Sequence, residues 1–90
     1  MRFKAGDVVK LYPIEDSSES WLSPDGTYQL WVFEDGKASH TEQFLPNTLG
    51  IVLDVAKTRS HSTVIEMLLD DGRRLWVSSW NWVRTTSLAP

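Results

Sequence analysis

Four aromatic residues have the types and positions to form a contact surface for another molecule. Trp76, Trp80 and Trp82 lie close together near the end of the chain, and Tyr12 lies near its start. Large aromatic rings bury much area at low entropic cost, so they often anchor interfaces. We expect Trp76 and Trp80 to be exposed. Trp82 either joins them or packs in the core, and the sequence leaves both placements open.

Two acidic residues follow the first of these aromatic residues. Glu15 and Asp16 lie in a polar, acidic stretch just after Tyr12. They are placed to pair with an Arg or Lys of a partner, and such exposed pairs contribute only about 0–1 kcal/mol each. Their effect would be on orientation and association rate more than on affinity. We therefore predict a binding site made of Tyr12, Glu15, Asp16, Trp76, Trp80 and Trp82.

The residue types that carry catalysis or hold metals are sparse. The chain has no cysteine, and its two histidines, His40 and His61, have no carboxylate at metal-ligand spacing. Ser60, His61 and Ser62 are adjacent, and neighbours on an extended chain point in opposite directions, so they do not form a catalytic arrangement. We expect a protein that is not an enzyme, with no cofactor and no metal.

Charge and composition limit the classes of partner and the cellular locations that remain. The formal net charge of the 90 residues is −3, whereas phosphate binding usually needs a clustered basic face. No run approaches the roughly 20 apolar residues of a membrane span, and the N-terminus lacks the apolar stretch of a signal peptide. These features disfavour nucleic acid as a partner, indicate no membrane partner and predict a cytoplasmic location.

Alternating apolar residues and turn signals predict an all-β fold. "TYQLWVF" and "TVIEMLL" alternate with period two. Asp35–Gly36 and Asp71–Gly72 are hairpin signals, the latter between strands at 63–70 and 73–78. "SSWN" predicts a 3₁₀ turn before a last strand. Ile51, Val52 and Leu53 run together, which predicts a strand covered on both faces.

These strands predict one domain over residues 1–90, with an extra hairpin at about 20–43 and a frayed tail at about 87–90. Closure of the sheet into a barrel would remove its exposed edges. The inward positions predict a core of Val9, Leu11, Ile51, Val52, Ile65, Met67, Leu69, Leu75, Val77 and Val83.

Two segments resemble SH3-like domains. "VVKLYPIED" is similar to their "ALYDY" strand and following acidic loop, and "LWVSSWNWV" to their closing segment. The later half of the chain also resembles short SH3-like proteins of tailed bacteriophages. The resemblance implies a five-stranded SH3-like barrel with the extra hairpin in its long first loop, and places Tyr12 on a groove-lining tyrosine. Ser78 or Ser79 stands where that family has a groove proline. The resemblance therefore supports the fold rather than a groove for proline-rich peptides.

The leading hypothesis is a non-catalytic protein-interaction or assembly module. A second is a nucleic-acid-binding barrel of the KOW type, in which basic residues contact phosphates and Trp76 stacks on bases. Its basic residues would be Arg59, Arg73, Arg74 and Arg84. A third is a structural subunit that buries its tryptophan surface by self-association.

Overall fold

The computed structural model describes residues 3–12 and 25–85, and these residues are all-β. Seven strands form within them: β1 (Val8–Leu11), β2 (Tyr28–Glu34), β3 (Lys37–Phe44), β4 (Leu49–Lys57), β5 (Thr63–Leu69), β6 (Arg74–Ser78) and β7 (Trp82–Arg84). A 3₁₀ turn, η2 (Ser79–Asn81), precedes β7, as "SSWN" predicted. In this described part no helix has the length and apolar character to cross a membrane.

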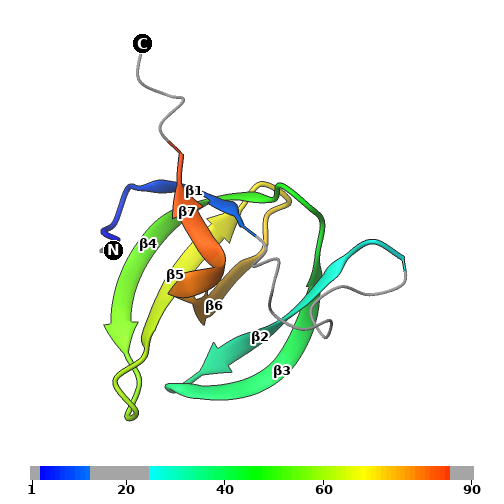
Figure 1. Cartoon of the computed structure of the whole chain (residues 1–90). Helices are drawn as coiled ribbons and strands as arrows, with labels where there is room; N and C mark the ends of the chain where they lie inside the picture. The colour runs from blue at the N-terminus through cyan, green and yellow to red at the C-terminus, as the bar shows by residue number, and fades with distance from the viewer. Residues whose placement is uncertain (1–2, 13–24, 86–90) are drawn as a thin grey trace.

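The strands make one antiparallel sheet in the order β3-β2-β6-β5-β4-β1-β7. The hairpin predicted at about 20–43 is present as β2 and β3, while residues 20–24 and the predicted tail lie outside the described residues. The predicted closure of the sheet is wrong, because among the described residues β3 and β7 remain its two ends. The sheet is strongly bent, and Figure 1 shows the tip of the β2–β3 hairpin and the β4–β5 turn at the same end of the molecule.

The ends of the sheet meet through side chains instead of a ladder. Phe44 on β3 and Trp82 on β7 are buried, and their ring centroids lie 5.9 Å apart with an interplanar angle of 79°. This edge-to-face geometry is favoured by the ring quadrupoles. The contact places the apolar faces of the outermost strands against one core, so the bent sheet encloses its interior without hydrogen-bonded closure.

Both predicted Asp–Gly hairpins are confirmed by the backbone. Asp35 and Gly36 have φ of 54° and 77°, and Glu34 pairs with Lys37, so two residues with positive φ join β2 to β3. Gly72 has φ of 94°, and its N–H donates to the carbonyl of Leu69 at 3.0 Å. Glycine adopts such φ values without the cost of a Cβ.

Most of the predicted core is confirmed, with two corrections. Val83 is only half-buried, and Ile51 is 45% exposed. Ile51 pairs with Leu68 on the outer face, so β4 is not covered on both faces there. Burial alternates from Leu49 to Val52, and the register of β4 then shifts between Val52 and Asp54, so the three consecutive apolar residues do not mark a strand buried on both faces. The core also takes in residues that the prediction did not include: Phe3, Leu30, Val32, Phe44 and Trp82.

Two isoleucines on neighbouring strands give a matched test of this facing. Ile65 is fully buried, whereas Ile51 is 45% exposed. We expect Ile65→Ala to lower the free energy of unfolding by about 2–5 kcal/mol, because it leaves a cavity. The same change at Ile51 should cost less than about 1 kcal/mol. Denaturant unfolding measures both, and equal losses would contradict the assigned faces.

Candidate functional site

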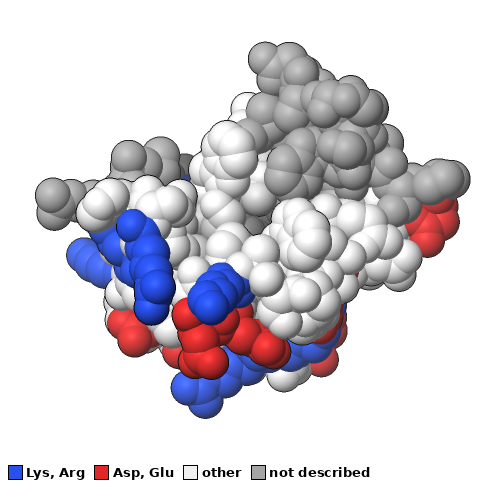
Figure 2. Space-filling view, turned by 90° about the horizontal axis from the view of Figure 1, so that it is seen from below, with Lys and Arg blue, Asp and Glu red and all other residues white. Residues whose placement is uncertain are grey.

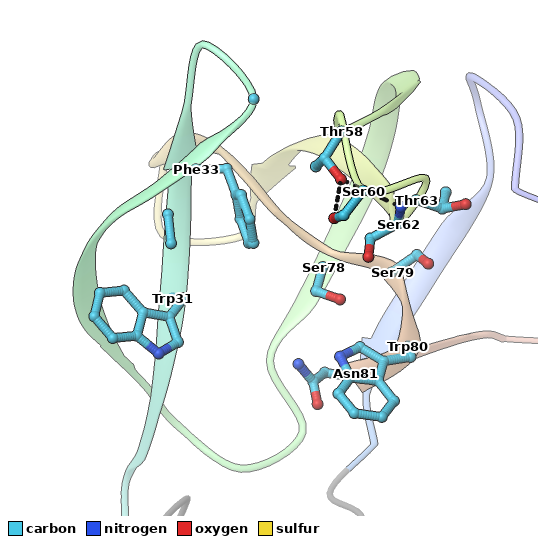
Figure 3. A pocket seen from close by; sticks show the side chains of 12 residues that line it. Trp31, Phe33, Thr58, Ser60, Ser62, Thr63, Ser78, Ser79, Trp80 and Asn81 are labelled. Atoms are coloured by element: carbon cyan, nitrogen blue, oxygen red, sulfur yellow. Dashed lines mark hydrogen bonds between the residues drawn. The ribbon is translucent and has the colours of Figure 1, made fainter.

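A hollow of about 660 Å³ opens on the outer face of the sheet between the β2–β3 hairpin, the β4–β5 turn and η2. Figure 3 shows Trp31 and Phe33 on one side and Trp80 with a group of hydroxyl side chains on the other. Its lining residues are Trp31, Phe33, Gly36, Ala38, Thr58, Ser60, Ser62, Thr63, Ser78, Ser79, Trp80 and Asn81. We call this hollow the groove.

Two tryptophans of the groove are unusually exposed for such large rings. Trp31 is 51% exposed and Trp80 is 64% exposed. Trp31 lies on β2 between the buried Leu30 and Val32, so its side chain must leave the opposite face of the strand. Trp80 lies in the middle of η2, where the short turn carries it away from the core. The groove therefore presents aromatic area from two separate elements.

The register of the hairpin changes where it enters the groove. Val32 pairs with His40 but Phe33 pairs with Ala38, so β3 has one extra residue at this point. Such an irregularity bends a strand and redirects its side chains. Phe33 and Ala38, the pair on its far side, both line the groove.

The β4–β5 turn is braced by its own hydrogen bonds. Thr58 Oγ1 lies 3.0 Å from Ser60 Oγ, and the Ser62 backbone N–H donates to Thr58 Oγ1 at 3.2 Å. The Thr58 N–H donates to the Ser62 carbonyl at 2.9 Å. His61 takes a positive φ of 67° at the tip. These contacts fix the turn, so a ligand would meet a wall that is already ordered.

The described lining residues of the groove carry no charge and combine aromatic rings with hydroxyl and amide groups. Figure 2, seen from below relative to Figure 1, shows an area of uncharged residues with basic and acidic side chains along one side of it. Hydroxyl and amide groups both donate and accept hydrogen bonds. The surface thus suits a ligand that offers apolar groups together with neutral polar groups.

The aromatic residues predicted as the site are divided by the structure. Trp80 lines the groove, whereas Trp76 is half-buried in an adjoining hollow and Trp82 is 2% exposed in the core. The surface placement of Trp82 is therefore excluded. Tyr12 is 55% exposed beside η2, where its N–H donates to the Asn81 carbonyl at 2.8 Å. Glu15 and Asp16 lie outside the described residues.

Sequence reasoning missed Trp31 and Phe33. The only signal available was the alternation of "TYQLWVF", which places both residues on the face opposite Leu30 and Val32. The pairing of β2 with β6, through Val32–Val77 and Phe33–Trp76, is what brings them beside η2. That pairing is long-range and leaves no local mark in the sequence.

A set of ion pairs attaches the hairpin to the β5–β6 turn. Arg73 Nη1 lies 2.9 Å from Glu42 Oε1, and its Nε lies 2.9 Å from Asp71 Oδ2. The Arg73 guanidinium also lies over the Phe44 ring, 4.9 Å from the centroid. Hydrogen bonds from His40 and then Arg73 lower the pKa of Glu42, and bonds from Arg73 lower the pKa of Asp71. The hairpin that carries Trp31 is thus attached at the C-terminal end of β3, where Glu42 and Phe44 lie.

Neither histidine is among the described residues that line the groove. His40 contacts Glu42 and Ser39 on β3, and His61 is at the tip of the β4–β5 turn. No group of three or more His, Cys, Asp or Glu side chains in residues 3–12 and 25–85 is arranged to hold a metal ion. Comparison with protein-family models, with curated proteins and with solved structures finds no significant match to this chain.

The different exposure of the tryptophans predicts that replacing them will lower the free energy of unfolding by different amounts. Trp31→Ala and Trp80→Ala should each cost less than about 1 kcal/mol, and Trp82→Ala about 3–5 kcal/mol. Trp82→Phe should recover part of that loss, because Trp82 Nε1 has no hydrogen-bond partner among the described residues. Denaturant unfolding of the four variants checks this. If Trp80→Ala unfolds the domain, its ring belongs to the core and the site is wrong.

The lowered pKa of Glu42 predicts how the hairpin attachment depends on pH. A carboxyl whose pKa is lowered in the folded state stabilises the fold above its ordinary pKa, and this stabilisation is lost as pH falls through the folded pKa. Glu42→Gln should therefore be less stable than wild type at about pH 7, with the difference shrinking at about pH 3. Urea unfolding at both values measures it, and a difference that does not change with pH would contradict the role of Glu42.

Proposed function

We propose that this protein is a non-catalytic protein-interaction module with an SH3-like fold, which binds an extended segment of a partner protein in the groove. In this proposal β1, β4, β5, β6 and β7 form the SH3-like unit, and the β2–β3 hairpin is an insertion in its first long loop. The strand order supports it, because β4, β5 and β6 are consecutive neighbours and β7 follows η2 to pair with β1.

The observation that carries the proposal is the exposure of Trp31 and Trp80 on different walls of one groove. Tryptophan rings that are half-exposed leave apolar surface in contact with water. Contiguous exposed apolar surface is typical of interaction sites. The flanking Ser, Thr and Asn side chains can pair with the backbone of an extended peptide. An ordered β4–β5 turn lowers the entropic cost of that binding.

The distribution of ion pairs supports a protein ligand over nucleic acid. Three of the four arginines that would contact phosphates are occupied within the fold. Arg73 pairs with Glu42 and Asp71, Arg74 Nε lies 3.0 Å from Glu66 Oε2, and Arg84 Nη1 lies 3.9 Å from Asp7 Oδ2. A phosphate backbone would also have to lie along a groove whose described lining is uncharged.

Selection of short random peptides displayed on phage tests the function directly. We expect the wild-type domain to enrich a peptide family that binds it in solution, as measured by fluorescence anisotropy. Trp31→Ala and Trp80→Ala should each weaken that binding about tenfold or more, as for aromatic anchors. Leu68→Ala is the matched control, because Leu68 is exposed on β5 but lies outside the groove.

Two outcomes would overturn this function. No enriched peptide would count against a peptide-binding groove. A rise in mass with concentration by light scattering, abolished by Trp31→Ala or Trp80→Ala, would instead assign the groove to self-association.

A further inference from the structure

A second hollow of about 440 Å³ adjoins the groove at the tip of the hairpin. The two share Phe33, Gly36 and Thr58, so the Phe33 side chain forms the boundary between them. The two hollows therefore form one surface with two compartments.

The floor of the second hollow is apolar. Trp76 pairs with Phe33 across the β2–β6 ladder and is half-buried. Val64 is only 4% exposed although it lies outside the main core cluster. Its burial on the outer face shows that side chains already pack around it there. The second compartment thus has a formed base rather than an open sheet surface.

The rim of the second hollow differs from the groove in charge. Lys57 and Arg59, both exposed, line it from the end of β4 and the following turn, and Asp35 lines it from the hairpin tip. Neither basic group has a carboxylate within 4.0 Å among the described residues, whereas Arg73 has two and Arg74 and Arg84 have one each. Two cations against one carboxylate leave this compartment with an excess of positive charge.

Resting on the proposed function, we infer that the partner segment carries an Asp or Glu side chain that binds Lys57 and Arg59 in the second hollow. The residues beside it lie on Phe33 and Trp76, and the following segment fills the uncharged groove between Trp31 and Trp80. Charge-assisted hydrogen bonds to a carboxylate are stronger than neutral ones, and Arg binds carboxylates through two parallel N–H groups. Because the acidic residue binds in the second hollow and the uncharged part in the groove, the two compartments would fix which way the bound segment runs as well as its composition.

The peptide selection described above also tests this inference. Peptides enriched on the wild-type domain should carry Asp or Glu at one end more often than the starting library. The double variant Lys57→Glu/Arg59→Glu should lose that preference. For one enriched peptide, replacing its acidic residue by Gln or Asn should weaken binding to wild type about tenfold, and the loss should be smaller at high salt.

A matched control separates this local effect from the overall charge. Lys4→Glu/Lys10→Glu makes the same change in net charge at exposed positions outside both hollows. It should leave the acidic preference unchanged. Circular dichroism of each double variant checks that the fold is retained, and the single variant Arg59→Gln replaces Lys57→Glu/Arg59→Glu if that double variant unfolds.

The outcomes distinguish this inference from the function on which it rests. Enriched peptides that need Trp31 and Trp80 but show no acidic preference would overturn the acidic ligand and leave the function standing. Absence of any enriched peptide would overturn both. Binding of single-stranded oligodeoxythymidine that is tighter than any peptide, falls steeply with salt and is lost in Lys57→Glu/Arg59→Glu would assign the surface to nucleic acid.

Discussion

The edge-to-face contact between Phe44 and Trp82 is the interaction on which the rest of this structure depends. These residues come from the two end strands of the sheet, and each is almost fully buried. Without their contact the sheet would have two apolar faces open to water at its ends. Because the rings meet, the first and last parts of the sheet share one core. The Arg73 guanidinium lies over the same Phe44 ring, so the charged attachment of the hairpin and the apolar closure of the core meet at one residue.

The candidate site follows from how the hairpin is attached. β2 pairs with β6 through only two residue pairs, and the remaining support comes from buried side chains and the Glu42–Arg73–Asp71 ion pairs. This short ladder is enough to set Trp31 and Phe33 beside the β4–β5 turn and η2. It leaves the hairpin tip, with Asp35 and Gly36, projecting along the groove and the second hollow. The side chains that would meet a ligand thus come from the β2–β3 hairpin on one side and from the β4–β5 turn and η2 on the other.

Structural features that depend on residues close together in the sequence were predicted well. Strict alternation and the Asp71–Gly72 turn placed β5 and β6 nearly to the residue, and "SSWN" predicted η2. Ile51 was assigned wrongly because three apolar residues in a row hide the break in register after Val52. The placement of Trp82 could not be decided, since its partner Phe44 is distant in the sequence. The alternation in β2 places Trp31 opposite Leu30 and Val32, but its neighbours in the groove depend on a β2–β6 pairing that local patterns do not encode.

The position of β1 has a consequence for folding kinetics. This strand is made early, yet its two sheet neighbours, β4 and β7, come much later in the chain. Pairings between distant residues must first overcome the entropy of closing long loops, so proteins rich in them fold slowly, typically in milliseconds to seconds. The consecutive strands β4, β5 and β6 pair with their neighbours along the chain, so we expect them to form before β1 and the hairpin join the sheet. During synthesis on the ribosome, β1 therefore lacks its second sheet neighbour, β7, until Trp82 has been added and has left the exit tunnel.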